Sequence, residues 1–512
     1  MNPPNHSRCL ECEEILLSQV SDERPVQLLE IPHSALAGLP EGRNSFDVTR
    51  RRLLQAGVAG LASVYGPKAL GWESVWESAV AQADTGNCLV LVYIAGGNDG
   101  LNTLIPAGST DYGKYVGARP VLHRGQGATA NGLVGSRPVP NTSGTTPLAF
   151  ANPLVSTGGG GDNSFAIGLD TLYGNGKGIS SDNLALMPAV DYTPPNLSHF
   201  ESSDYWFAGA LQQLSTGWLG RWLDTNGSQT NPLQAISINS SISKAIRTST
   251  APVCAIPNTY NLGFSFSGTG GTGLQGTNYA VPNANTPLNA LGGVPASAGN
   301  THLARSRQTY QESVSVFQDT GSLPTLSPAA PYPTLSSDTQ LVTQFQLAAT
   351  LLAAGLGTRI ITISWGGFDT HGNQIATQDP QLATLSRCLA AFQQDLQNKG
   401  VASKVSTLVF SEFGRRVAEN GSHGTDHGAG GLMLAMGQKV RGGLAAPFPG
   451  LSTLDATGDL VVSTDFRSVY QAVISEWLGT DPGQVLPGSP AGGFAALQRP
   501  DGSGNTLFDV NK

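Results

Sequence analysis

The sequence predicts an α/β fold in which a mostly parallel β-sheet carries helices on both faces. Two observations lead to this prediction. Short, strongly apolar runs rich in β-branched residues stand at residues 89–94, 359–365 and 405–410. Segments with apolar residues at helical spacing alternate with these runs along the chain. In a sheet of this kind, ligands bind beyond the carboxyl ends of the strands.

The first half of the domain is predicted to contain two strands and several helical segments. Residues 89–94 form an apolar run that ends in a glycine-rich turn, as a buried strand does. Residues 183–188 predict a second, shorter strand, and residues 198–222 place apolar and aromatic side chains at helical spacing. The stretch 226–333 is rich in Gly, Ser, Thr and Asn, so it predicts an insertion or a cap over the core, with one helix at 302–317.

The second half is predicted to alternate helices with strands. Three segments have apolar residues on one helical face: 338–356, 380–399 and 465–478. The first of these helices leads into the strand at 359–365, and the second precedes the strand at 405–410. This alternation is the reason for expecting parallel strands.

The composition is that of a loop-rich and weakly charged protein. The chain has 512 residues, of which 12% are charged, with 64 glycines and 32 prolines. Its net charge of −8 disfavours a nucleic-acid partner, because binding a phosphate backbone requires a basic surface. The sequence contains no run of about 18 apolar residues, so we expect no transmembrane helix in the mature chain.

Residues 1–83 are predicted to be a leader with an export signal. Residues 49–55 resemble the twin-arginine motif and lead into a mildly apolar stretch at 56–64. Small residues at 79–83 form a typical cleavage pattern, which a basic surface helix would not need. We therefore expect the twin-arginine translocase to export the folded protein, leaving residues 84–512 as a single domain that is periplasmic or secreted.

Acidic residues and histidines gather on glycine-flanked loops at or near the ends of the predicted strands. Six of them are candidate metal ligands: Asp99, Asp369, His371, Glu412, Asp426 and His427. Singly, these residues also suit turns, and Glu412 suits an ion pair with Arg415 or Arg416. Together, on four separate segments, they predict a site for zinc, manganese, magnesium or calcium. Such an ion polarises a phosphoryl or sulfuryl oxygen and activates a nucleophile.

Three further residues are candidates for catalysis. Ser198 stands at a predicted helix start, where free backbone N–H groups favour anions, and it is the candidate nucleophile. A helix N-cap is the simpler alternative for this serine. His199 is a candidate base or ligand, and Arg415 is a candidate oxyanion clamp. Asn98 and Asn102 are candidate hydrogen-bond donors to the same oxyanion.

Five motifs indicate a family. Over about residues 88–480 the sequence resembles the exported bacterial family called domain of unknown function 1501, with these motifs in the expected order: LVYIAGGNDGLN at 91–102, SHF at 198–200, FDTH at 368–371, SEFGR at 411–415 and GTDHG at 424–428. This resemblance implies a fold similar to the alkaline phosphatase and sulfatase superfamily.

The resemblance also implies roles for individual residues. Asp99 resembles the aspartate after the first strand, and Ser198 stands where a nucleophile at a helix start is expected. Asp369 and His371 look like an Asp/His ligand pair.

The later motifs fit the superfamily in two ways. Glu412 stands where strand-end Asp-His ligands are expected, and His427 resembles the late histidine ligand. In a different register, Asp426 and His427 are themselves the Asp-His pair. Phe413 stands where a ligand histidine would be, so the resemblance is compatible with one metal ion or with an altered pair.

The function expected from these observations is hydrolysis of phosphate or sulfate esters by an exported metalloenzyme. The alternative is a non-catalytic secreted binding or surface-assembly protein that keeps the fold. Convergence of the ligand atoms on one point with an open position would favour the enzyme, whereas a closed ligand shell would favour a structural ion.

Overall fold

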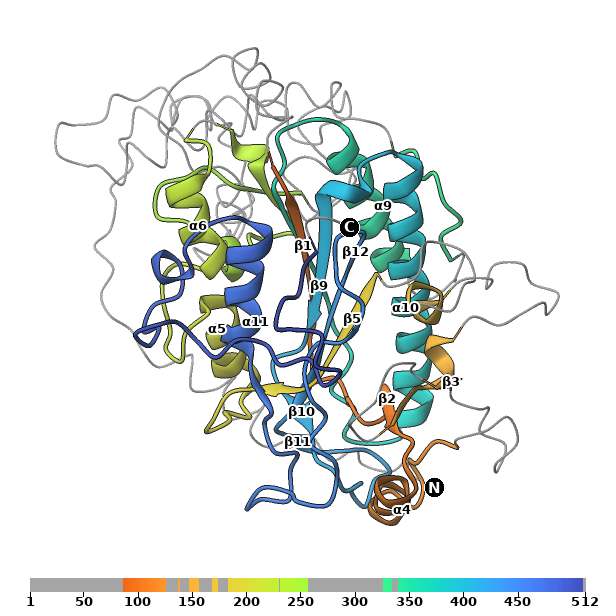
Figure 1. The fold of residues 1–512 in the computed structure, drawn as a ribbon. Helices are drawn as coiled ribbons and strands as arrows, with labels where there is room; N and C mark the ends of the chain where they lie inside the picture. Colours follow the sequence, from red (N-terminus) through yellow and green to blue (C-terminus); the bar gives the residue numbers. More distant parts are fainter. Residues whose placement is uncertain are drawn as a thin grey trace, which may run out of the picture. The chain divides into compact units, whose positions relative to one another are not determined.

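The computed structural model describes residues 86–125, 137–138, 147–155, 168–173, 183–229, 231–256, 326–333 and 339–509. These residues all belong to one compact unit, whose ribbon is drawn in Figure 1. The predicted leader at 1–83 and the predicted helix at 302–317 lie outside the described residues.

A nine-stranded sheet forms the centre of the described structure, with the strand order β13-β5-β12-β9-β1-β8-β6-β7 and β14 paired with β5. Its strands are β1 (Cys88–Ile94), β5 (Leu184–Asp191), β6 (Ala235–Ile238), β7 (Cys254–Ala255), β8 (Ile360–Trp365), β9 (Val405–Phe410), β12 (Gly431–Gly437), β13 (Gly443–Leu444) and β14 (Thr464–Asp465).

The sheet is mixed but mostly parallel, so the predicted α/β class is confirmed. β1 pairs in parallel with β8 on one side and with β9 on the other. Within the described part of this nine-stranded sheet, β12 alone runs against its neighbours, β5 and β9. The carboxyl ends of β1, β5, β8 and β9 therefore meet at the same edge of the sheet.

Helices cover both faces of the sheet (Figure 1). On one face lie α9 (Thr339–Ala353) and α10 (Gln374–Asn398), and on the other lie α5 (His199–Ala208), α6 (Trp218–Asn226) and α11 (Phe466–Ala472), which continues as a π-helical turn at Val473–Trp477. Each helical layer encloses its own apolar core. This two-core arrangement explains why the central strands are buried along nearly their whole length.

Shorter elements complete the fold. They are α4 (Ser109–Ala118), the sheet of β2 (Leu104–Pro106), β4 (Leu148–Phe150) and β3 (Arg137–Pro138), the ribbon of β10 (Gly414–Arg415) and β11 (His427–Gly428), and 3₁₀ helices at Asn152–Leu154, Leu169–Leu172, Pro232–Gln234, Lys244–Ile246, Ala402–Lys404 and Pro482–Gln484. Within the described part of the chain, the helices are too short or too polar to cross a membrane.

The structure differs from the prediction at two places that matter for the site. α10 begins at Gln374, six residues before the predicted start, and it contains Pro380 in its interior. Buried contacts of Gln374 and Gln378 hold the turns before this proline. In addition, the predicted insertion at 226–333 is too broad, because its first part supplies β6 and β7 to the sheet.

Candidate metal centre

The candidate ligands come from loops at the shared carboxyl edge of the sheet. Asp369 follows β8, and Glu412 follows β9. His199 is the first residue of α5, which comes after β5, and His427 lies in β11. Parallel strands thus bring together residues that are up to 228 positions apart in the sequence, from 199 to 427.

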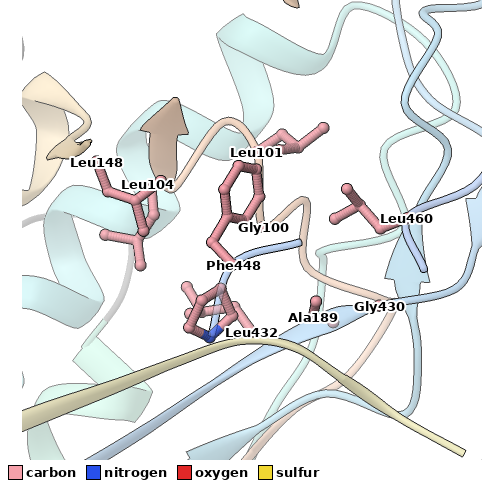
Figure 2. Close-up of a pocket in the computed structure, with 11 residues that line it drawn as sticks. Gly100, Leu101, Leu104, Leu148, Ala189, Gly430, Leu432, Phe448 and Leu460 are labelled. Carbon is pink, nitrogen blue, oxygen red and sulfur yellow. The ribbon is translucent and has the colours of Figure 1, made fainter. Parts of the chain in front are cut away.

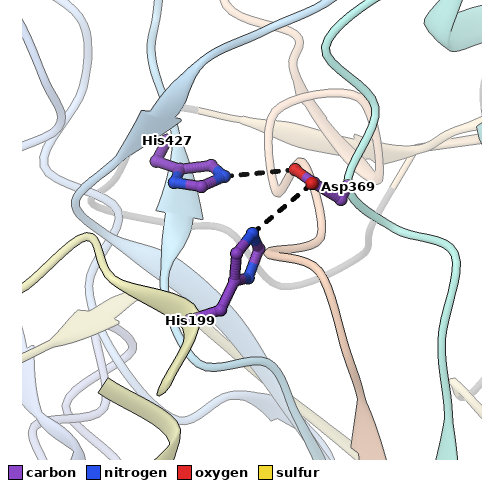
Figure 3. Close-up of side chains that lie close together, drawn as sticks. All are labelled: His199, Asp369 and His427. Atoms are coloured by element: carbon purple, nitrogen blue, oxygen red, sulfur yellow. Dashed lines mark hydrogen bonds and ion pairs between the residues drawn. The ribbon is translucent and has the colours of Figure 1, made fainter. Parts of the chain in front are cut away.

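Two histidines converge on the Asp369 carboxylate, as Figure 3 shows. His199 Nε2 lies 3.4 Å from Asp369 Oδ2, and His427 Nε2 lies 3.1 Å from Asp369 Oδ1. One ligand atom from each of the three side chains can be chosen so that all lie within 4.8 Å of one another. This is the geometry of a candidate cation site assembled from three separate segments of the chain.

His371 joins the group from the same loop as Asp369. Its Nε2 lies 2.9 Å from Asp369 Oδ1 and 3.0 Å from the Nε2 atom of His427. The side chains of Asp369 and His371 are 41% and 40% exposed, so the group is open to solvent on this side.

The other ring nitrogen of each histidine faces an oxygen that accepts hydrogen bonds. His199 Nδ1 lies 2.7 Å from Glu412 Oε1, and His371 Nδ1 lies 3.1 Å from Asp426 Oδ1. His427 Nδ1 lies 2.9 Å from the backbone carbonyl of Leu197. A carboxylate or a carbonyl oxygen can only accept, so all three Nδ1 atoms carry the proton and donate it. The Nε2 atom of each ring therefore faces Asp369, and it offers a lone pair to a cation once the ring has lost its second proton.

Lone pairs so close together require a proton or a cation between them. Two ligand atoms of a tetrahedral zinc ion are about 3.3 Å apart, given metal–ligand distances of about 2.0–2.1 Å. The observed separations of 2.9, 3.0, 3.1 and 3.4 Å are close to that value. Carboxylates and carbonyls that orient ligand histidines through Nδ1 are also typical of metal sites. The residues present therefore fit a divalent cation.

The pKa values of the histidines and of Asp369 are shifted by the charges that these side chains place on one another. Burial disfavours the charged form of His199, but the nearby Asp369 and Glu412 outweigh it and raise its pKa to about 9. Burial also opposes ionisation of Asp369, whose pKa is nevertheless held far below its usual range by hydrogen bonds from the histidines and Arg415. The pKa of His371 is raised, chiefly by its hydrogen bond to Asp369.

The pKa of His427 is shifted in the opposite direction. Burial, reinforced by the positive charges of Arg415 and His199, lowers its pKa although Asp369 acts to raise it. His427 is therefore the histidine most readily available as a neutral ligand, whereas His199 holds a proton that a cation must displace.

Metal affinity should consequently increase with pH. Because the pKa of His199 is about 9 in the metal-free protein, a cation must release this proton at any lower pH. One released proton corresponds to roughly a tenfold gain in affinity per pH unit. Calorimetric zinc titrations at pH 6, 7 and 8, each in two buffers of different ionisation enthalpy, will measure the zinc affinity and the number of protons released on binding. An affinity that is independent of pH, with no proton release, would contradict the assignment of His199 as a ligand.

Protonation of His199 also affects the folding stability of the metal-free protein. The pKa of His199 is raised from 6.5 to about 9, so the stability that its charged form contributes is present below pH 6.5. This stability is lost as the pH rises through 9.

Phe413 packs against both imidazoles that converge on Asp369, and these two imidazoles also contact each other, with ring centroids 4.5 Å apart. Its ring centroid lies 5.0 Å from that of His199 and 4.4 Å from that of His427, and its side chain is buried. Phe413 thus supports both imidazole rings from their buried side. The sequence offers no signal for this role beyond its position after Glu412.

Arg415 holds the loops together. Its guanidinium side chain is 0% exposed and donates to Asp369 Oδ1 at 2.6 Å. It also donates to backbone carbonyls of the 96–97 turn, of Phe368 and of Thr425. With its N–H groups engaged inside the protein, Arg415 positions Asp369; it is not exposed as the predicted oxyanion clamp would be.

Asp99 is not brought to the histidine group. Its carboxylate is fully buried and forms an ion pair with Arg119, with Nη1 to Oδ2 at 2.6 Å. Burial opposes ionisation, but Arg119 outweighs it and lowers the pKa of Asp99. The amides of Asn98 and Asn102, predicted donors to an oxyanion, instead donate to Thr103 Oγ1 and to the carbonyl of Leu122. The structure thus gives these three residues scaffold contacts.

Glu412 and Asp426 contact the Nδ1 atoms of the histidines, away from the point where the Nε2 atoms meet. Both orient a ligand in this arrangement. Burial opposes ionisation of each carboxyl, but His199 for Glu412, and Asn420 and His371 for Asp426, lower the pKa values.

Ser198 occupies the N-cap position of α5, as the simpler prediction has it, but its side chain makes no capping hydrogen bond. Its neighbours on both sides touch the histidine group: the Leu197 carbonyl accepts from His427, and His199 faces Asp369. The hydroxyl of Ser198 is therefore carried on a segment that borders the candidate site.

A small apolar pocket lies among the turns that follow β1 and β11 (Figure 2). Leu101, Leu432 and Phe448 are among its lining residues, which are all glycines or apolar residues. These side chains offer no group for acid–base chemistry or metal binding, so the histidine group is the stronger candidate for the functional site.

Fold and site together define an α/β protein with a candidate metal centre at the carboxyl edge of its sheet. Residues 303–474 match the family described as "Protein of unknown function (DUF1501)". This match supports the resemblance drawn from the motifs, and it includes the loops of Asp369, Glu412 and His427 but not His199. No curated protein and no solved structure matches the chain.

Proposed function

We propose that this protein is an exported, metal-dependent hydrolase of phosphate or sulfate esters. The observation that carries the proposal is the convergence of three Nε2 atoms on Asp369, with each Nδ1 held by a fixed acceptor. The partial exposure of Asp369 and His371 supports access by a small substrate or the end of a polymer. Export rests on the twin-arginine pattern at 49–55.

Zinc is the cation that the donor set favours. Histidine nitrogens with one carboxylate suit zinc, and manganese is the next candidate, whereas magnesium and calcium prefer sites made of oxygen ligands. His199, Asp369 and His427 would hold the ion, with His371 as a fourth donor. When bound, a divalent ion of this kind polarises the ester oxygen and supports formation of a nucleophile.

Residues of the chain supply the other roles in the proposed reaction. Glu412 and Asp426 keep the Nδ1 protons in place and thereby aim the Nε2 atoms of His199 and His371. Ser198 is the proposed nucleophile, at the start of α5, where unpaired backbone N–H groups favour an anionic ester. Arg415 fixes Asp369 from the interior. Overall, water cleaves the ester into an alcohol and phosphate or sulfate.

A substrate screen tests the proposal. The purified mature chain, loaded with zinc, should release nitrophenol from at least one of three probes: 4-nitrophenyl phosphate, bis(4-nitrophenyl) phosphate or 4-nitrophenyl sulfate. A chelator should abolish this release and added zinc should restore it. Ser198→Ala should lower kcat by at least about a thousandfold. Ser203→Ala is the matched control, because this serine lies on the same helix and its hydroxyl contacts the carbonyl of Phe200 and the hydroxyl of Tyr93, not the histidine group.

Two outcomes would overturn parts of this account. Full activity of Ser198→Ala would show that water, and not this serine, attacks the ester. Stoichiometric zinc without hydrolysis of any probe would favour the second candidate function, a secreted binding or surface-assembly protein with a structural ion. His371 gives that second candidate its support, because a fourth protein ligand closes a tetrahedral shell.

A further inference from the structure

A fully buried ion pair links two segments near the candidate metal centre. Arg119 donates through Nη1 and Nη2 to the two carboxylate oxygens of Asp99, at 2.6 and 3.1 Å, and neither side chain is measurably exposed. Arg119 also donates to the carbonyls of Arg416 and Val417, at 2.9 and 2.8 Å. The pair therefore connects the turn after β1 with the segment after β10.

Gln374, the first residue of α10, extends this network. Its Nε2 donates to Asp99 Oδ2 at 2.6 Å. Its Oε1 accepts from the hydroxyls of Thr425 at 2.6 Å and Thr370 at 3.0 Å. One buried amide thus connects the ion pair to two threonines at once.

The two threonines belong to the loops that carry the candidate ligands. Residues 369–371 form the first ligand loop and residues 425–427 form the second. Their backbones are also hydrogen-bonded to each other, from Thr425 N to Thr370 O at 3.1 Å. The distance between Asp369 or His371 and His427 therefore depends on contacts that Gln374 secures.

A gain in folding stability alone is a weak explanation for a buried polar network of this kind. A buried ion pair must repay the loss of hydration of both charges, and apolar side chains of the same volume often stabilise a fold equally well. A fully satisfied buried polar network does, however, fix one arrangement of the groups around it.

We propose that the chain of contacts from Arg119 through Asp99 to Gln374 positions the two ligand loops against each other and thereby sets the metal affinity of the site. Asp99 is then a positioning residue for the histidine group. This inference rests on the proposed metal site, and it adds residues that act on the cation only through the ligands they hold.

Gln374→Met tests the inference, because methionine fills a similar volume but cannot join Asp99 to the threonines. Zinc affinity should fall by about 10- to 100-fold, as it does when other outer partners of ligands are removed. Gln378→Met is the matched control. Gln378 is equally buried one turn further along α10, and its amide nitrogen donates to Asn98 Oδ1 and to the carbonyl of Asp99. Its Oε1 accepts a longer contact of 3.3 Å from Gln374 Nε2, but Gln378 itself does not contact either ligand loop. Its zinc affinity should stay within about twofold of the wild type.

Hydrogen exchange of the Thr425 amide supplies a second readout, in the metal-free proteins. Gln374→Met should speed this exchange and Gln378→Met should not, even if both variants lose the same global stability. Should Gln374→Met fail to fold, Thr425→Val removes one of the two hydroxyl contacts and should give a smaller loss in the same direction.

The result that would overturn the inference is wild-type zinc affinity in Gln374→Met, or an equal loss in Gln378→Met. Failure of the proposed function would look different, because the wild-type chain would then bind no zinc. In that case the exchange of the Thr425 amide still decides whether Gln374 holds the loops.

Discussion

Replacing Asp369 by asparagine and His371 by alanine in one chain should abolish metal binding and, with it, metal-dependent ester hydrolysis. Asp369 is the carboxylate on which the histidines converge, and His371 contacts both Asp369 and His427. Loss of an outer partner alone costs about 10- to 100-fold in affinity, so loss of two ligands should cost considerably more. Asparagine keeps the Oδ1 acceptor for Arg415 and so limits damage to the interior.

Stability provides an independent measurement of the same effect. Zinc at about 100 times its Kd should stabilise the wild-type protein by about 2.7 kcal/mol, and this gain should disappear in the double variant. His423→Asn is the matched control, since His423 is a more exposed histidine on the neighbouring loop, and asparagine tolerates its φ of 57°. A zinc-dependent stabilisation of the double variant equal to that of the wild type would place the cation elsewhere.

Gly96→Ala should have the largest effect on the fold around the site. A Cβ atom at residue 96 would lie 2.3 Å from the backbone nitrogen of Asp369 and 2.7 Å from the carbonyl carbon of Phe368, and the φ of Gly96 is +119°. Backbone atoms cannot move aside as a flexible side chain can. The N–H of Gly96 also donates to both Glu412 oxygens, at 2.9 and 3.1 Å. One methyl group therefore displaces Asp369 and the partner of His199 together.

The expected loss in the free energy of unfolding is at least about 3 kcal/mol, the range of overpacking combined with backbone strain. Zinc binding should be lost in any folded fraction. Gly366→Ala is the matched control: it follows β8 directly, and nothing lies within 4 Å of its added Cβ atom. Chemical denaturation of the two variants side by side measures the difference. A change below about 1 kcal/mol for Gly96→Ala would contradict the described packing of the turn after β1 on Asp369.

Apolar runs were sufficient to predict four strands of the nine-stranded sheet, β1, β5, β8 and β9, and the edge at which they end. β1, β8 and β9 are buried on both faces, so their sequences are almost continuously apolar and easily recognised. The strand Gly431–Gly437 is absent from the sequence-based prediction, although it is equally apolar. It follows the second ligand loop directly and runs antiparallel, which the alternation of strands and helices does not suggest.

The start of α10 shows how tertiary contacts override local signals. Proline is favoured in the first turn of a helix, so Pro380 predicts a helix beginning there. The helix instead begins at Gln374, whose side chain is buried against Asp99 and the two threonines. No periodicity in the sequence indicates these contacts, and Gln374 is therefore missing from the predicted site.

The sequence indicated which residues come together in the candidate site better than it indicated the role of each residue. The motifs around residues 369–371 and 426–427, and His199, come together in the structure. Asp99 and Glu412 stand after strands just as Asp369 does, and local sequence does not distinguish a ligand from a residue that orients one. The difference depends on partners far along the chain: Arg119 for Asp99, and His199 for Glu412.

The measurement that tests the central claim most directly is the zinc content of the purified mature chain after loading and exhaustive dialysis, beside the Asp369→Asn/His371→Ala variant. The described geometry predicts about one zinc ion per wild-type chain and none in the variant. Absence of bound metal from the wild-type protein, even after reconstitution with zinc or manganese, would contradict the metal centre and the hydrolase proposed from it.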